Sequence, residues 1–152
     1  MSLIQRISSI FKSKDIEISG IWNGHYGFGE PYSETVRKKT VQFTAEISSE
    51  DNGYFTGTIK ESDEGIPEIS RMEGRIRGNK IVFEKTYKKS YQIDETGKLY
   101  SKHGPQHVNY NGVYIQSRNV FSGQWIIKSM YVFDDGRKQE HVSLGNWSME
   151  KE

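Results

Sequence analysis

The stretch from residue 16 to residue 28 constrains the fold of this chain more than any other. Every second residue is apolar, aromatic or glycine, and the residues between are mostly polar, with Ile21 as the exception. The positions that share one parity are Ile16, Ile18, Gly20, Trp22, Gly24, Tyr26 and Phe28. Because side chains two residues apart lie on the same face of a strand, the pattern predicts a long, half-buried β-strand.

A Gly-x-Trp step occurs within this strand and twice more along the chain. The three copies are Gly20-Ile21-Trp22, Gly123-Gln124-Trp125 and Gly145-Asn146-Trp147. In each copy the glycine and the tryptophan point the same way. A strand glycine permits a sharp bend or a close approach by another group, and a nearby tryptophan can fill the space it leaves free. The repeated step therefore indicates a sheet that rolls up on itself.

Further segments have the composition of strands and are separated by turn residues. They span roughly residues 40–48, 54–61, 71–77, 80–88, 107–116, 120–131 and 139–149. Asn52-Gly53, Gly78-Asn79 and Asp135-Gly136 supply the turn chemistry between neighbours. Residues 29–39 form a polar loop, and residues 89–104 could add a short strand pair about Gly97.

These segments predict the fold class. No helix long enough for a crossover intervenes, so neighbouring strands should pair antiparallel in an up-and-down meander. Closing the meander into a barrel removes its exposed edges. We therefore expect an all-β, antiparallel up-and-down β-barrel of about 8–10 strands, formed as one domain by residues 16–152. A barrel of about eight strands is either filled by its side chains or holds one small ligand.

Closure of the meander also makes a prediction about the three tryptophans. The final strand should return beside the first, and the strand that holds Trp125 should lie next to the final strand. We therefore expect Trp22, Trp125 and Trp147 to be largely buried near one end of the barrel, packed across the gaps left by the glycines.

Composition narrows the classes of function. The 152 residues carry 21 Lys and Arg against 20 Asp and Glu, which argues against nucleic acid or an anionic membrane as the main partner. The absence of cysteine excludes disulfides, a thiol nucleophile and Cys-based metal sites. No apolar run approaches the roughly 20 residues of a transmembrane helix. We expect a cytoplasmic protein.

Residues 1–15 differ from the rest of the chain. Apolar residues recur at helical spacing, which predicts a short N-terminal amphipathic helix. They are Leu3, Ile4, Ile7, Ile10 and Phe11. The helix could anchor the protein to a membrane surface or act as a lid. Alternatively, it plugs one end of the sheet or packs on a partner chain, in which case residues 2–13 could form a homo-oligomer contact.

The opening Gly20-x-Trp22 strand followed by an antiparallel meander resembles the calycin superfamily, which includes lipocalins, fatty-acid-binding proteins and avidin-like barrels. Together with Phe55-x-Gly57, Gly123-x-Trp125 and Gly145-x-Trp147, the pattern is similar to small uncharacterised bacterial lipocalin-like domains. The resemblance implies a barrel that binds a small, mostly apolar ligand. The paired Arg and Tyr that hold a fatty-acid carboxylate have no match near the last strands, where Tyr131 and Arg137 flank a turn.

The histidines give no strong site. His103 and His107 are four residues apart, but a metal would need further ligands and a supporting second shell. By parity His25 should face outward, whereas His141 shares the parity of Trp147 and is the better candidate for an inward position. We assign no metal site, no catalytic residue and no cofactor.

Lys85 is the one charged residue singled out, because it shares parity with Phe83 and Tyr87 and could point inward. Glu61 could pair with it, since an unpaired buried charge is costly. Lys85 could then anchor the acid group of a ligand, or it could sit at the barrel mouth and reach water along its stem.

The candidate ligand-binding residues are the large side chains expected inside the barrel. They are Trp22, Tyr26, Phe83, Lys85, Tyr87, Tyr110, Tyr114, Trp125 and Trp147. They either fill the core or line a cavity with stacking surfaces and hydroxyl donors. The favoured hypothesis is a non-enzymatic barrel that binds a small apolar or amphipathic molecule. The alternative is a structural or protein-interaction module with a filled barrel, and an enzyme would rest only on His103, His107 and Lys85.

Overall fold

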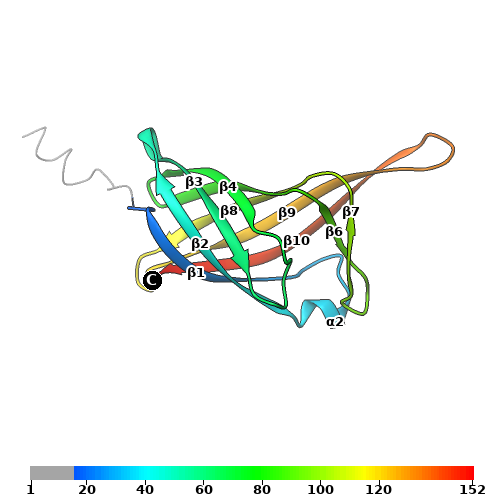
Figure 1. The fold of residues 1–152 in the computed structure, drawn as a ribbon, viewed down its shortest axis with the longest axis horizontal. Helices are drawn as coiled ribbons and strands as arrows, with labels where there is room; N and C mark the ends of the chain where they lie inside the picture. Colours follow the sequence, from blue (N-terminus) through cyan, green and yellow to red (C-terminus); the bar gives the residue numbers. More distant parts are fainter. Residues whose placement is uncertain (1–15) are drawn as a thin grey trace, which may run out of the picture.

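A computed structural model describes residues 16–152 (Figure 1). Within these residues, eight antiparallel strands form a closed barrel in the order β1-β10-β9-β8-β5-β4-β3-β2. The barrel strands are β1 (Gly20–Gly27), β2 (Thr40–Ser49), β3 (Tyr54–Glu61), β4 (Ser70–Arg77), β5 (Lys80–Tyr87), β8 (Gln106–Ile115), β9 (Val120–Val132) and β10 (Lys138–Lys151). The predicted all-β barrel is confirmed, whereas the predicted N-terminal helix lies outside the described residues.

The barrel closes where the first strand meets the last, as the meander predicts. β1 pairs with β2 on one side and with β10 on the other, with Tyr26 opposite Val41 and Trp147. β10 in turn pairs with β9 along its length. The Gly-x-Trp steps therefore lie on three adjacent strands.

The turns follow the predicted chemistry. Arg77 pairs with Lys80 across a two-residue turn in which Gly78 has φ of 59°. At the turn between β2 and β3, where the short 3-10 helix η1 (Asp51–Gly53) forms, Asn52 has φ of 60° and Gly53 has φ of 78°. Only glycine and, less often, asparagine adopt such a backbone at low cost, so these residues fix where the hairpins reverse.

Two small elements interrupt the meander. The β6 (Ser90–Ile93) and β7 (Leu99–Lys102) strands form a separate two-stranded sheet inserted between β5 and β8, which confirms the strand pair expected about Gly97. The expected polar loop after β1 contains one turn of helix, α2 (Glu34–Arg37). The Ser33 hydroxyl accepts a hydrogen bond from the Val36 amide and caps this turn, and Val36 is buried.

The glycines and tryptophans complement each other across strands. A Cβ atom on Gly145 would lie 2.5 Å from Cε2 of Trp125, and one on Gly112 would lie 2.8 Å from Cζ2 of Trp147. Each indole therefore occupies the space that a glycine on another strand leaves free, on the adjacent strand for Trp125 and two strands away for Trp147. The sequence predicted this use of the glycines, but the contacts join different strands rather than the members of one Gly-x-Trp step.

Trp22, Trp125 and Trp147 are all buried, as predicted. The prediction that they gather at one end of the barrel is wrong. Trp22 lies opposite Lys151 and packs against Phe121, whereas Trp147 lies opposite Tyr26, four residues along β1. Trp125 lies opposite Gly145, further still along β10. The residues are spread along the axis because the antiparallel register, and not parity, sets their heights.

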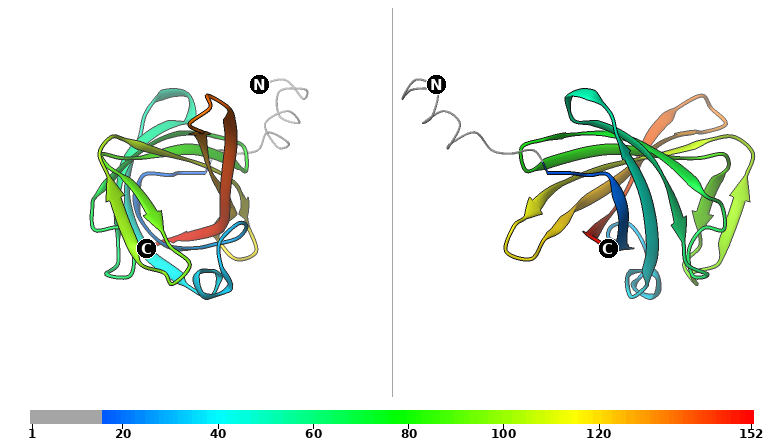
Figure 2. Two further views of the ribbon diagram at one scale, coloured as in Figure 1. Left: turned by 90° about the vertical axis from the view of Figure 1, so that its right-hand side faces the viewer. Right: turned by 60° about the vertical axis from the view of Figure 1, so that its left-hand side comes forward.

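The two ends of the barrel differ. Figure 1 shows the β6–β7 hairpin and the extended tip of the β9–β10 hairpin at the same end, with α2 at its rim. Figure 2 (left) looks into this end and shows β6 and β7 crossing in front of the barrel. Deeper in, buried side chains fill the interior, among them Trp22, Phe55, Phe83, Phe121 and Trp147. The hairpin end is where the interior opens.

Candidate functional site

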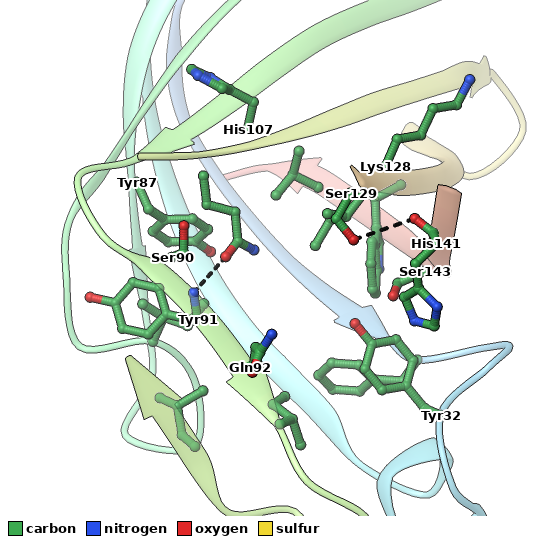
Figure 3. A pocket seen from close by; sticks show the side chains of 18 of the residues that line it. Tyr32, Tyr87, Ser90, Tyr91, Gln92, His107, Lys128, Ser129, His141 and Ser143 are labelled. Atoms are coloured by element: carbon green, nitrogen blue, oxygen red, sulfur yellow. Dashed lines mark hydrogen bonds between the residues drawn. The ribbon is translucent and has the colours of Figure 1, made fainter. Parts of the chain in front are cut away.

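A pocket of about 1090 Å³ occupies the hairpin end of the barrel. Its wall comes from β1, β5, β8, β9 and β10, from the loop before α2, and from the β6–β7 hairpin. Figure 3 shows Tyr32 on one side of this pocket and Tyr87 and Tyr91 on the other. The pocket forms because β9 and β10 continue beyond the filled part of the barrel while the hairpin stands over the opening.

One wall of the pocket is an aromatic cluster built on Trp125. Tyr26 and Phe28 meet the indole edge to face, with ring centroids 6.3 and 5.9 Å away, and Tyr32 lies 6.1 Å from it. The indole nitrogen of Trp125 donates to the carbonyl of Gly27 at 2.9 Å, which fixes the ring in place. These mutual contacts make a rigid apolar surface suited to another ring.

The opposite wall is held by Glu68, which precedes β4. Tyr91 donates its hydroxyl hydrogen to Glu68 at 2.9 Å, and its ring lies 5.5 Å from that of Tyr87. Burial and this acceptor raise the pKa of Tyr91 to about 12. Tyr91 is therefore a neutral ring at physiological pH, and its hydrogen bond anchors β6 to the barrel.

Lys85 lies in the floor of the pocket and forms an ion pair with Glu61 behind it. The Lys85 Nζ lies 3.6 Å from Oε2 of Glu61, and the two side chains are 2% and 0% exposed. The pairing that parity suggested is confirmed. The expectation that Lys85 reaches water at the mouth is wrong, because β5 places it below the rings of Tyr26, Tyr87 and Tyr110.

Both carboxylate oxygens of Glu61 already accept hydrogen bonds. Oε1 accepts from the Tyr26 hydroxyl and, at 3.2 Å, from the Ile66 amide, while Oε2 accepts from the Tyr87 hydroxyl. With Lys85 beside Oε2, the carboxylate has about as many partners as it can take. Glu61 lies behind these residues and does not line the pocket.

Lys85 also sits among aromatic faces. Its Nζ is 4.8, 4.9 and 5.2 Å from the ring centroids of Tyr26, Tyr87 and Tyr110. Burial alone would lower the pKa of Lys85, but Tyr110 and Glu61 outweigh it, and the pKa lies above its usual value. Lys85 is therefore a charged ammonium and not the neutral amine that a nucleophile requires.

The tyrosines of the floor stay protonated. Burial first, and then the negative charge of Glu61, raises the pKa of Tyr26 and of Tyr87 well above the ordinary value. Burial also raises the pKa of Tyr110, although Lys85 opposes this. The floor therefore holds one positive and one negative charge among neutral hydroxyl groups.

The structure divides the nine candidate residues. Five line the pocket: Tyr26, Lys85, Tyr87, Tyr110 and Trp125. The other four, Trp22, Phe83, Tyr114 and Trp147, do not line it. Of these, Trp22, Phe83 and Trp147 belong to the buried core, and Tyr114 packs against it. Parity identifies inward side chains but not their height in the barrel, and only height separates the two groups.

Sequence reasoning missed several lining residues. Phe28 continues the alternation of the first strand, so this signal was available in the sequence. Tyr32 lies in a loop without periodicity, and Tyr91 and Gln92 lie in the short β6 strand. Their approach to the barrel depends on how the loop and the hairpin fold back, for which the sequence carries no direct signal.

The histidines are exposed. His25 faces outward as predicted, and it contacts Ser148 on the outer surface. His141 lines the pocket near its rim but is exposed, so it has no buried inward position. His103 is exposed too, and His107 contacts Glu84 at 3.1 Å. Among residues 16–152, no three His, Asp or Glu side chains lie close enough to hold a metal ion.

No family model, no curated protein and no solved structure matches this chain. In the part of the chain that the structure describes, no helix has both the length and the apolar character needed to cross a membrane.

Proposed function

We propose that this protein is a non-enzymatic binding protein that holds a small amphipathic molecule in the open end of its barrel. The observation that carries the proposal is the pocket of about 1090 Å³, which is at the upper end of the size of small-molecule sites, roughly 300–1,000 Å³. Seven Phe, Tyr and Trp side chains line it, and polar side chains such as Gln92 and Ser143 face the same space (Figure 3). Such a mixture suits a ligand with an apolar body and a few polar atoms.

The floor chemistry favours binding over catalysis. Lys85 is charged and paired, and the four partners of Glu61 occupy both of its oxygens. Neither group is placed to attack a substrate or to take its proton. The resemblance to calycins supports the same proposal, since known calycins bind small, mostly apolar ligands. The alternative is a structural or protein-interaction module whose barrel is completely filled. The pocket at one end of the barrel supports this alternative less than it supports ligand binding.

Fluorescence titration with N-phenylnaphthylamine, an uncharged aromatic probe, tests the proposal. Wild-type protein should bind the probe with saturation. Ile127→Trp should weaken binding roughly 10-fold or more, because Ile127 lines the pocket and an indole there fills the ligand's space.

Ile126→Trp is the matched control. Ile126 is the neighbouring residue on β9 and has the opposite parity, so its side chain is directed to the other face of the sheet. It should leave binding unchanged. Failure of the wild type to bind, or equal weakening by both variants, would count against a ligand in the pocket.

A further inference from the structure

The pocket floor carries information about the charge of the ligand. Lys85 and Glu61 neutralise each other, and both side chains are almost fully buried. An anionic ligand would compete for Lys85 with a carboxylate that four groups already hold. A cationic ligand would meet Lys85, whose ammonium already occupies the faces of Tyr26, Tyr87 and Tyr110. The floor therefore disfavours a ligand of either sign.

The mouth of the pocket shows the same balance. Asp94 and Glu95 at the tip of the β6–β7 hairpin line it, and so do Lys102 and Lys128. These side chains are solvated, where charge interactions are weak and screened. Two acidic and two basic groups nearly cancel, so the electrostatic potential at the mouth favours neither an anionic nor a cationic ligand.

One hydroxyl group in the floor has a hydrogen to donate. Tyr26 and Tyr87 both donate to Glu61, so their hydrogens are committed. Tyr110 differs, because its charged neighbour is Lys85, whose Nζ lies 5.2 Å from the Tyr110 ring centroid and can only donate to the hydroxyl oxygen. Among the hydrogen bonds of residues 16–152, none uses the hydroxyl hydrogen of Tyr110. Tyr110 is 4% exposed and lines the pocket, so the hydrogen is available to a bound molecule.

The walls define the shape of the ligand. Figure 3 shows the Tyr32 ring facing the pocket from one side and the Tyr91 ring from the other. Behind them, Phe28 and Trp125 back the first wall and Tyr87 backs the second. Aromatic surfaces on both sides of a pocket favour a ring system that can stack on or meet them edge to face.

We propose that the pocket binds an uncharged, flat aromatic molecule, and that a carbonyl oxygen or ring nitrogen of this molecule accepts a hydrogen bond from the Tyr110 hydroxyl. This inference rests on the proposed binding function and adds the chemical class of the ligand. Lys85, held by Glu61, can only donate to the Tyr110 oxygen, so the hydroxyl hydrogen of Tyr110 can turn to an acceptor on the ligand.

Three fluorescent probes test the inference on wild-type protein. N-phenylnaphthylamine is uncharged, anilinonaphthalenesulfonate has the same rings with a sulfonate, and propionyl(dimethylamino)naphthalene is uncharged with a carbonyl acceptor. We expect both uncharged probes to bind at least roughly 10-fold more tightly than the sulfonate probe, because the sulfonate would bring an unpaired charge to the pocket floor. Bound propionyl(dimethylamino)naphthalene should show the red-shifted emission of a hydrogen-bonded carbonyl.

Tyr110→Phe tests the hydrogen bond. This variant should bind propionyl(dimethylamino)naphthalene about 3- to 10-fold more weakly than the wild type does. Its affinity for N-phenylnaphthylamine should be unchanged, because only the former probe has the carbonyl acceptor. Tyr114→Phe is the matched control, since the Tyr114 hydroxyl donates to Asn119 outside the pocket. If Tyr110→Phe does not fold, the emission of the carbonyl probe on wild-type protein decides the point.

The outcomes separate the two proposals. Sulfonate binding as tight as that of the uncharged probes, or emission typical of a carbonyl without a hydrogen bond, overturns the ligand class while leaving the binding function in place. Equal loss of both uncharged probes in Tyr110→Phe also overturns it. If no probe binds to wild-type protein, the binding function itself fails, and the ligand class fails with it.

Discussion

At the scale of single residues, the buried pair of Lys85 and Glu61 is the most consequential feature. A buried ion pair is weak evidence for stability, because desolvation offsets much of the attraction. Removing one partner is different, since it leaves the other charge buried and alone. Removing one partner of this buried pair should therefore cost much more stability than removing one partner of a surface ion pair.

We expect Lys85→Met to lower the free energy of unfolding by about 3–5 kcal/mol, measured by urea denaturation. The double variant Lys85→Met, Glu61→Gln should be more stable than Lys85→Met, because no charge is left buried. Arg71→Met is the surface control: the Arg71 pair with Glu73, at 2.6 Å, is exposed and should contribute less than about 1 kcal/mol. Wild-type stability in Lys85→Met would show that the buried pair is energetically silent.

At the scale of elements, the β6–β7 hairpin is the part that stands over the pocket. Its tip is tied to the opposite rim by two hydrogen bonds, from the Ser33 hydroxyl to the Glu95 carbonyl at 2.7 Å and from Lys39 Nζ to the Gly97 carbonyl at 3.4 Å. Its base is tied by Tyr91 to Glu68. A hairpin held by a few polar contacts, without pairing to the barrel sheet, should open at lower free energy than the barrel strands.

Ser33→Ala should therefore speed hydrogen exchange at the β6 and β7 amides, read by mass spectrometry, and leave the β3 and β4 amides unchanged. Ser33 also caps α2, so faster exchange at α2 alone would report loss of the cap and not of the tie. Lys39→Met separates the two effects because it removes only a tie. Thr58→Ala, at an exposed position on β3, is the neutral control. Unchanged exchange in both Ser33→Ala and Lys39→Met would show that the hairpin is held by other contacts.

At the scale of the whole molecule, closure of the barrel depends on large side chains that bridge strands across the interior. Trp22 on β1 is 1% exposed and lies 5.4 Å from the ring of Phe121 on β9, and its indole nitrogen donates to the Ile18 carbonyl at 2.8 Å. It lies in the filled part of the barrel, away from the pocket lining. Trp22 is therefore part of the core.

Trp22→Ala should cost about 3–5 kcal/mol of unfolding free energy, seen as a large fall in Tm, because it opens a cavity where β1 faces β9. Tyr54→Ala also removes a large aromatic side chain and is the control on the outer surface, where the Tyr54 side chain is about half exposed. It should change Tm far less. A Trp22→Ala protein with normal Tm and impaired probe binding would contradict the core assignment and make Trp22 part of the site.

The sequence by itself determined the strands, the turns and the inward faces. Alternation, turn glycines and the absence of a crossover helix are local properties, and they predicted β1 to β5, β8 to β10 and the pairing of Lys85 with Glu61. Only the tertiary structure decided the height of each inward residue, and therefore which aromatics fill the core and which line the pocket. The reason is physical: parity is set by the backbone of one strand, whereas height depends on the register and length of its neighbours. The tertiary structure also set the positions of Tyr32, Tyr91 and the hairpin at the opening. These positions depend on how segments without a repeating pattern fold back onto the closed barrel.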